Sequence, residues 1–480
     1  MKALSTESDS ELTGRAMALN SSLEVAEFSM KVLGLRENLD TMFVLVMGGI
    51  ICFLQSGFAM LEAGSVRTKN VANILSKNFA DMGLGVLGFG LLGYGLAFGE
   101  GNEWVGLQYF GGYGLPLSLL PHAFMQATFA ATCSTIVSGA VAERSDYVGY
   151  LIFSMLVTGV VYPVQVHWTW SPQGWLAQRG FQDFAGSGVV HLAGAMLALP
   201  GAVIIGPRLG LSEGIPGHSI PLCCLGFFIL NFGFMAFNGG STGSISQRGD
   251  GETLARAVVN TLLGSCSGGA TTLFLYKMLT NRWSLLRSIN GALAGMVGVC
   301  AGCNLYLPHA ACLVAVLASI THLLLSGAMQ VLGIDDPLDA VAVHGGGGTV
   351  GILSVAIFMP GGLWQGGSEA ASNLLSANAL GAAVISGYNL TVGILLFGGL
   401  RLVGRLRKDA ETEMIGSDWV KHGEESYPQA AWLQLEDPKK LLRRQNSTHG
   451  TLSAIRNELR AYHEGLNEGP NTLGKRLPSI

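Results

Sequence analysis

Long apolar stretches recur along almost the whole chain, and they constrain its fold more than any other feature. We count eleven, each near the ~20 residues that an α-helix needs to cross the hydrocarbon core of a bilayer. Only 12% of the residues are charged, which is about half of the ~25% typical of soluble domains. The sequence therefore predicts an all-α polytopic membrane protein with eleven transmembrane helices. Their approximate limits are 42–64, 79–99, 122–142, 148–168, 184–206, 219–238, 253–276, 288–303, 307–326, 341–359 and 381–403.

The basic residues predict the orientation of the chain. If the N-terminus lies outside, the outer loops hold only Arg179 and Arg248. Because cytoplasmic loops carry the excess of Lys and Arg, this distribution favours an N-out, C-in topology. We expect an extracellular segment at 1–41, which contains a glycosylation sequon at Asn20, a transmembrane domain at 42–404 and a cytoplasmic tail at 405–480. The inner loops would hold Arg67, Lys69, Lys77, Arg144, Arg208, Lys277, Arg282 and Arg287.

Charge and cysteine placement exclude several other classes of protein. A net charge of −4 argues against a nucleic-acid partner, because such partners are bound mainly through Lys and Arg. All eight cysteines fall within or at the ends of apolar stretches, so they form no disulfide framework. Cys300 and Cys303 have the CxxC spacing, but no second ligand pair accompanies them. We expect neither a metal nor a cofactor.

Two histidines lie inside long apolar stretches, and each follows an aspartate at the edge of its stretch. His191 comes eight residues after Asp183, and His344 comes five residues after Asp339. An ionisable side chain at bilayer depth costs a few kcal/mol and usually marks a pathway or a site. The helical rise places the two histidines about 12 Å and about 7.5 Å into their helices, approaching the midplane from opposite faces. Neither aspartate reaches its own histidine across these spacings, so we predict that both aspartates cap helix starts.

The two halves of the chain share a sequence pattern. Residues 57–65 and 233–241 both read G-F, five variable residues, then G-S, and the Asp…His segments introduce the fifth and tenth stretches. The first five spans and the next five are therefore interpreted as copies, and because five is odd, the second copy is inverted. Inverted repeats are typical of transport proteins, whose site lies near the midplane between the halves. The predicted fold is thus a 5+5 inverted repeat plus one extra helix.

Paired neutral imidazoles favour a small transported species. Each offers one hydrogen-bond donor and one acceptor, which suits ammonia, water or proton relay and suits a bulky organic solute poorly. At the predicted outer mouth, the face of Trp170 near a polar group such as Ser241 could hold a small cation. The alternative for Trp170 is an ordinary aromatic belt at the membrane interface.

Six motifs together resemble the ammonium transporter (Amt/Mep/Rh) family, over roughly residues 40–428. They are Gly57-Phe-Ala-Met-Leu-Glu-Ala-Gly64 with Lys69-Asn70, Gln126-Ala-Thr-Phe129, Gly139-Ala-Val-Ala-Glu-Arg144, Asp183-Phe-Ala-Gly with His191, Phe237-Asn-Gly-Gly-Ser241, and Asp335-Asp-Pro-Leu-Asp339 with His344-Gly. The resemblance implies eleven spans, N-out and C-in, in agreement with the topology drawn from the basic residues. It also implies a homotrimer with one pore per subunit.

The resemblance assigns roles at the outer mouth. Trp170, Phe129 and Ser241 match the family's ammonium recruitment site. Asp183 matches the acidic residue that shapes this site without facing the ion. Trp170 favours the ammonium-transporter branch over the Rh branch, although its match depends on a small gap in the 170–183 segment.

Further along the pore, the resemblance assigns a gate and a lumen. Phe129 and Phe237 match two stacked rings that close the pore, and His191 and His344 match the twin histidines that line an apolar lumen. Phe234 departs from the pattern, because many members carry Trp there.

In the predicted tail, residues 416–424 resemble the family's cytosolic regulatory motif. The resemblance gives Gly416, Asp418 and His422 a structural or regulatory role. Val420 stands where plant members place a phosphorylated Thr, so that switch is predicted to be absent.

The function implied by the resemblance is ammonium transport, with methylammonium as an analogue, in a multi-pass protein that we expect in the plasma membrane. Because an intact ion is costly to dehydrate in an apolar pore, ammonium is expected to lose its proton and cross as ammonia. Three alternatives stay open: an Rh-like channel for neutral ammonia or carbon dioxide, an ammonium sensor whose tail signals to a cytosolic regulator, and a membrane hydrolase using the Asp/His cluster.

Overall fold

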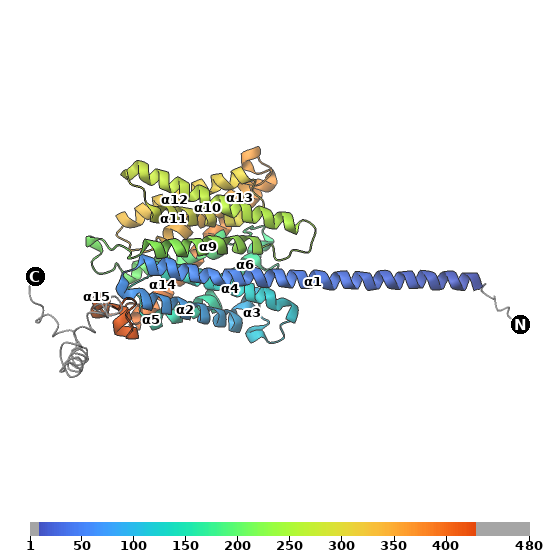
Figure 1. Cartoon of the computed structure of the whole chain (residues 1–480), viewed down its shortest axis with the longest axis horizontal. Helices are drawn as coiled ribbons and strands as arrows, with labels where there is room; N and C mark the ends of the chain where they lie inside the picture. Colours follow the sequence, from blue (N-terminus) through green and yellow to red (C-terminus); the bar gives the residue numbers. More distant parts are fainter. Residues whose placement is uncertain (1–8, 429–480) are drawn as a thin grey trace, which may run out of the picture. The chain divides into compact units, whose positions relative to one another are not determined.

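The structure, a computed structural model, describes residues 9–428 and is almost entirely helical (Figure 1). The side chain of Asn20 and the predicted tail beyond residue 428 lie outside the described part. The α-helices are α1 (Asp9–Ser65), α2 (Val71–Gly88), α3 (Tyr94–Phe98), α4 (Leu120–Ala140), α5 (Tyr147–Leu156), α6 (Tyr162–Trp170), α7 (Trp175–Gln178), α8 (Ala193–Ile205), α9 (Ile220–Gly240), α10 (Asp250–Thr280), α11 (Leu285–Val299), α12 (Pro308–Val331), α13 (Gly347–Phe358), α14 (Glu369–Leu402) and α15 (Ala410–Ile415). The short 3-10 and π-helical turns are η1 (Thr68–Asn70), η2 (Phe89–Gly93), η3 (Phe110–Gly112), η4 (Leu117–Leu119), η5 (Val157–Val161), η6 (Ser187–Leu192), η7 (Leu211–Glu213), η8 (Cys300–Gly302), η9 (Val341–Gly346), η10 (Leu363–Gln365) and η11 (Asp418–His422).

Ten helical segments of the described chain are long and apolar enough to cross a membrane. With no β-strand between residues 9 and 428, they confirm the predicted class, an all-α polytopic membrane protein. They correspond to ten of the eleven predicted stretches. The remaining stretch, 122–142, forms α4, which has the length of a span at 21 residues. Its buried Thr and Ser side chains reduce its hydropathy.

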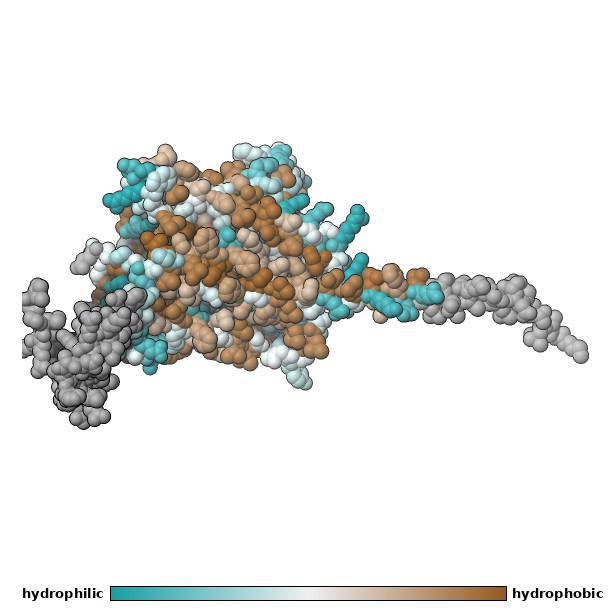
Figure 2. All heavy atoms as spheres, in the orientation of Figure 1, coloured by the Kyte–Doolittle hydropathy of each residue, from teal (hydrophilic) through white to brown (hydrophobic). Residues whose placement is uncertain are grey.

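The surface of the helices is apolar where they would meet lipid. On the face seen in Figure 2, apolar side chains cover the middle of the helical bundle, and hydrophilic ones gather toward its two ends. Phe228 and Phe232 of α9 and Phe274 of α10 are each more than half exposed. A soluble monomer rarely exposes so large an apolar area, so this band supports membrane insertion.

Helix α2 begins earlier than the sequence predicted, at Val71 instead of near residue 79. Lys77, which we assigned to an inner loop, lies within this helix and is only 1% exposed. The prediction was wrong because Lys77 and Asp81 interrupt the apolar run, and a charged residue in sequence normally indicates a solvated position. Here both side chains are buried.

The central pair of helices, α1 and α9, is antiparallel and joined through glycines. A Cβ atom on Gly57 would lie 2.8 Å from the side chain of Leu230, and one on Gly233 would lie 2.7 Å from that of Leu54. Gly233 follows Gly57 by the same number of residues as Leu230 follows Leu54. The Gly57–Leu230 contact and the Gly233–Leu54 contact are therefore counterparts in the two halves of the chain. A second matched pair of contacts is Gly64 with Cys223 and Gly240 with Met47. Small residues let backbones approach closely in membranes, and this reciprocal pattern is that of a pseudo-two-fold axis.

Candidate functional site

The two histidines meet in the interior of the protein. The rings of His191 and His344 are stacked, with centroids 5.1 Å apart and an interplanar angle of 21°. His191 is fully buried and His344 is 5% exposed. Within the described chain, neither ring nitrogen of His191 nor Nδ1 of His344 has a hydrogen-bond partner. Since buried polar atoms in proteins are nearly always paired, these nitrogens are candidates for contact with a transported species.

Each histidine lies in a π-helical turn that begins a longer helix. His191 is in η6, which continues into α8, and His344 is in η9, which continues into α13. The turns η6 and η9 contact each other. π-Helical turns are rare and are frequent at functional sites, and here they occur at matching positions in the two halves of the chain.

The carboxylate of Asp183 caps η6, as the sequence predicted. It accepts hydrogen bonds from four successive backbone N–H groups, those of residues 186–189, at 2.8–3.0 Å. Burial raises the pKa of Asp183, whereas these four donors and the positive end of the helix oppose that rise. The backbone carbonyl of Asp183 also accepts a 2.8 Å hydrogen bond from Nε1 of Trp170. Asp183 therefore fixes both the start of the histidine helix and the orientation of the tryptophan.

In the second half, the cap is Asp336, and our prediction of Asp339 was wrong. Asp336 accepts hydrogen bonds from the backbone N–H groups of Ala340 and Val341, at 3.0 and 2.7 Å. It precedes His344 by eight residues, the same spacing as between Asp183 and His191. Asp339 has a positive φ of 55°, which turns its side chain away from the helix start.

Asp339 instead anchors a polar cluster at the neighbouring helices. Its carboxylate pairs with the guanidinium of Arg287 at 2.5 Å and accepts a 2.8 Å hydrogen bond from Oγ of Ser326. Burial acts to raise the pKa of Asp339, but His322, Arg287 and Ser326 together hold it below its usual value. The role of Asp339 is therefore to connect α11 and α12 to the start of η9.

Aromatic rings lead from the surface to the histidines. Trp170 is partly buried, and its ring lies 5.8 Å from that of Phe129. Phe129 is 4.2 Å from Phe237, and Phe237 is 5.5 Å from His191, by ring centroids. The two Phe rings meet edge to face at 72°, so the prediction of stacked rings was wrong in orientation although correct in contact. An edge-to-face pair is a favoured aromatic geometry, and Phe237 of this pair lies against the ring of His191.

Ser241 lies one turn beyond Phe237, at the end of α9. Its Oγ donates a 2.8 Å hydrogen bond to the backbone carbonyl of Phe237 and is partly exposed. The hydroxyl oxygen keeps its lone pairs available as acceptors. The helix therefore places Ser241 next to the ring pair, and its role at an outer recruitment site stays a prediction.

Sequence reasoning missed the role of the repeated Gly-Phe pair. Phe234 stacks on His191, with centroids 5.4 Å apart and an angle of 17°. Its counterpart in the first half, Phe58, lines a small cavity together with His344. Both phenylalanines follow the glycines of the repeat, so the internal repeat itself carried the signal that would have identified them.

A small cavity borders His344, and a larger cavity lies next to the small one. The first has a volume of about 20 Å³ and is lined by His344, Phe58, Glu62 and Thr135, among others. This volume holds about one water-sized molecule. The second is much larger, about 500 Å³, and is lined by Arg287 and Asp339 among others. Leu61 and Leu338 line both cavities, so they lie at the boundary between the small cavity and the large one.

The tail residues Asp418 and His422 pack against the start of α2, and Gly416 packs against Lys69 in η1 just before it. The carboxylate of Asp418 accepts hydrogen bonds from the backbone N–H groups of Ala72 and Asn73, at 3.0 and 2.9 Å, and therefore caps this helix from a distant part of the sequence. Nε2 of His422 lies 3.1 Å from Oδ1 of Asn73.

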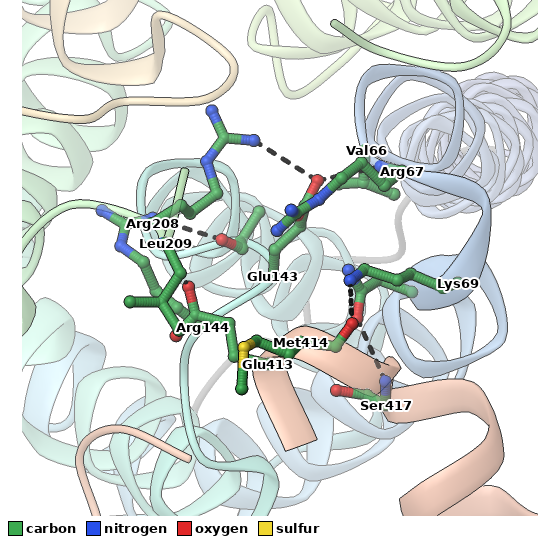
Figure 3. A network of polar contacts seen from close by, with 12 residues as sticks. Val66, Arg67, Lys69, Glu143, Arg144, Arg208, Leu209, Glu413, Met414 and Ser417 are labelled. Carbon is green, nitrogen blue, oxygen red and sulfur yellow. Dashed lines mark hydrogen bonds and ion pairs between the residues drawn. The ribbon is translucent and has the colours of Figure 1, made fainter. Parts of the chain in front are cut away.

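Charged loops hold the same tail segment in place. Figure 3 shows Glu143 between Arg67 and Arg208, and Lys69 beside the tail residue Met414. Glu143 accepts a 2.6 Å hydrogen bond from Nε of Arg67. Gly416 has a φ of 121°, and a Cβ there would lie 2.6 Å from Cβ of Lys69. Only glycine fits this contact.

Lys408 adds a buried contact between the tail and the same loop. Its Nζ donates hydrogen bonds to Ser417 Oγ, at 2.5 Å, and to Asn70 Oδ1, at 3.3 Å. Burial lowers the pKa of Lys408 to about 8. The tail up to residue 426 is thus part of the packed structure rather than a free extension.

Fold and site together define a class of protein: a multi-pass helical transport protein with paired histidines behind aromatic rings. The sequence profile of the Ammonium Transporter Family matches residues 42–427. A Caenorhabditis elegans ammonium-transporter relative is 41% identical over 442 residues, which cover 85% of this chain and 82% of the relative. Ammonium transporter Amt2 of Archaeoglobus fulgidus is 34% identical over 438 residues, which cover 84% of this chain and 92% of that protein.

Solved structures agree with these sequence matches. One of them, named Sensor Amt Protein, has a TM-score of 0.76 and 32% identity, and the match covers 81% of this chain and 99% of that one. Mep2 of Candida albicans has a TM-score of 0.73 and 25% identity, over 81% of this chain and 90% of that one. The chain belongs to the ammonium transporter family, and these Amt and Mep relatives confirm the predicted branch.

Proposed function

We propose that this protein transports ammonium across the plasma membrane through the path from Trp170 to the inner cavities. The observation that carries the proposal is the stacked pair of buried histidines whose ring nitrogens lack partners within the described chain. The ammonium-transporter names of its relatives support the choice of substrate. Methylammonium, a close analogue, should follow the same route.

At the outer mouth, Trp170, Phe129 and Ser241 recruit the ion. The aromatic faces attract a cation, and the Ser241 hydroxyl accepts one of its hydrogen bonds. Asp183 contributes without touching the ion, because its oxygens are occupied by backbone N–H groups. The edge-to-face pair of Phe129 and Phe237 is the gate that must open before the substrate reaches the histidines.

Past the gate, the substrate crosses as ammonia. Burying an unpaired ion in an apolar passage is far more costly than burying a neutral molecule that finds hydrogen bonds. His191 and His344 offer such bonds, and they can also pass a proton between them. This favours ion fragmentation at the gate, with the proton following the imidazole pair.

The membrane arrangement that we propose is an eleven-helix domain at 42–404, N-out and C-in, with a 5+5 inverted repeat and one extra helix. In support, α4 has span length, and the reciprocal glycine contacts of α1 and α9 match an inverted repeat. We place residues 1–41 outside and 405–480 in the cytosol, and we expect a homotrimer with one pore per subunit.

The test is voltage-clamp recording in oocytes together with uptake of labelled methylammonium. His191→Ala and His344→Ala should abolish both current and uptake, because each removes a hydrogen-bonding station from the lumen. His309→Ala is the matched control, since His309 is exposed at the start of α12 and its loss should change nothing. Normal uptake in both pore variants would contradict the proposal, provided that surface labelling shows equal amounts of protein.

A second candidate function is ammonium sensing through the tail. The observations that favour it are the similarity to the solved structure named Sensor Amt Protein and the direct capping of α2 by Asp418. A sensor would bind ammonium and change tail accessibility with little flux.

Uptake without current would instead indicate the neutral, Rh-like mode of conduction.

A further inference from the structure

Three ionisable side chains to which the proposed function assigns no role are buried between α1, α2 and α4. Glu62, Lys77 and Asp81 are each 1% exposed. Glu62 comes from α1, whereas Lys77 and Asp81 come from α2. Ionisable groups at membrane depth are costly and by default functional, so this acidic pair with one lysine requires an explanation.

Hydroxyl groups of α4 connect the two carboxylates. Ser138 Oγ donates a 2.7 Å hydrogen bond to Glu62, and Thr135 Oγ1 donates a 2.7 Å hydrogen bond to Asp81. Lys77 Nζ donates a 3.4 Å hydrogen bond to the backbone carbonyl of Ser138. One turn of α4 therefore spans the distance between the acids, and hydroxyls of this kind can both donate and accept a hydrogen bond.

Charge balance gives the cluster one exchangeable proton. Two carboxylates and one ammonium are neutral together only when one carboxyl group is protonated. The titratable groups that face the cluster are Tyr150, whose ring lies 4.6 Å from Lys77 Nζ, Cys133 near Asp81, Arg144, and His344 across the small cavity. Asn78 also donates a 3.1 Å hydrogen bond to Glu62. Because a net buried charge is strongly disfavoured, the resting cluster holds that proton.

Glu62 is the member of the cluster that reaches the transport path. It lines the cavity of about 20 Å³ together with His344 and Thr135. That space accommodates one water-sized molecule, which is enough to bridge an imidazole and a carboxyl group by hydrogen bonds. Leu61, next to Glu62 in sequence, also borders the cavity of about 500 Å³.

We propose that Glu62 is the proton station that follows His344, with Lys77 and Asp81 setting its charge balance. Glu62 loses its proton to a water in the small cavity, which passes it on past Leu61 and Leu338 to water in the large cavity, and Glu62 is reloaded from the histidine pair: an N–H bond of the protonated imidazole breaks, and an O–H bond forms on the carboxylate. The proton and the ammonia thus leave the lumen separately. This inference rests on the proposed function, because it requires that ammonium lose its proton at the outer side.

The test is Glu62→Gln, measured as charge moved per methylammonium taken up under voltage clamp. The substitution leaves Lys77 and Asp81 as a neutral pair, so the cluster stays balanced but has no proton to exchange. We expect uptake to remain within about twofold of wild type and the charge-to-uptake ratio to fall at least fivefold. Glu62→Asp, which restores a carboxyl group, should recover most of the ratio. Glu252→Gln is the matched control, since Glu252 is exposed at the start of α10.

An unchanged ratio in Glu62→Gln would overturn the inference and leave ammonium transport intact. A parallel loss of current and uptake in Glu62→Gln also leaves the ratio unchanged, so it would indicate a structural role for Glu62 and would overturn the inference. Wild-type uptake without current would overturn proton passage and this inference together. Absence of wild-type uptake, from protein shown to be at the surface, would instead refute the proposed function itself.

Discussion

The contact between α1 and α9 can be tested by adding one methyl group at Gly57. A Cβ at this position would lie 2.8 Å from Cγ of Leu230, 2.9 Å from its backbone nitrogen and 3.0 Å from the backbone oxygen of Gly226. Side chains can rotate away, but backbone atoms of a helix cannot. Gly57→Ala must therefore push the two helices apart by about half an ångström along their contact.

The expected loss of stability follows from this displacement. Gaps of 0.5–1 Å forfeit about a quarter to a half of the dispersion energy of the atoms involved, and overpacked cores typically lose about 1–3 kcal/mol. Against this, replacing glycine by alanine within a helix is favourable by up to ~1 kcal/mol. Gly49→Ala provides the matched control, because Gly49 is in the same helix and a Cβ there would meet nothing within 4 Å.

The measurement is the midpoint of thermal unfolding of the two variants in mild detergent. Helix propensity is common to both, so their difference reports packing alone, and we expect Gly57→Ala to unfold several degrees below Gly49→Ala. Methylammonium uptake should fall in Gly57→Ala and not in Gly49→Ala. An unfolding midpoint of Gly57→Ala equal to or above that of Gly49→Ala would refute the reasoning.

Three further predictions concern the helix caps and the tail. Asp418→Ala should speed amide hydrogen exchange in the first turn of α2 about fivefold, as expected for a cap worth ~1 kcal/mol. Asp418→Asn should have an intermediate effect, and unchanged exchange in Asp418→Ala would rule out the capping role. Gly416→Ala should produce the same acceleration, because its φ of 121° and its contact with Lys69 exclude a side chain, and an unaltered first turn would contradict this. Burial raises the pKa of Asp336 to about 7 from 3.8. Between these two pH values the folded protein holds a proton that the unfolded chain has released, so the stability of the fold decreases as the pH rises. The stability of wild type relative to Asp336→Asn should therefore decrease from about pH 4 to about pH 7 in thermal unfolding, whereas a pH-independent difference would argue against that shift.

The sequence by itself determined the class of protein and the location of its site. The length of an apolar run can be read from the local sequence, and a run long enough to cross the bilayer forms a membrane-spanning helix. Ten of the predicted stretches accordingly coincide with apolar helices long enough to cross it. His191 and His344 were identifiable because a titratable residue in such a run is rare. Their meeting was foreseeable from the repeat, since matching segments entered from opposite faces converge at the midplane.

The tertiary structure decided which polar residues face one another. Asp336 and Asp339 are three positions apart, and only the backbone conformation and the approach of Arg287 show that one caps η9 and the other pairs with a guanidinium. In the sequence, Lys77 has the charge typical of a loop residue. In the structure, α1 and α4 surround its side chain. The Arg287–Asp339 pair and the burial of Lys77 depend on contacts between residues far apart in the chain, and these contacts exist only after the helices have packed. The cap itself repeats the eight-residue spacing of Asp183 and His191, so the sequence did hold a signal for Asp336.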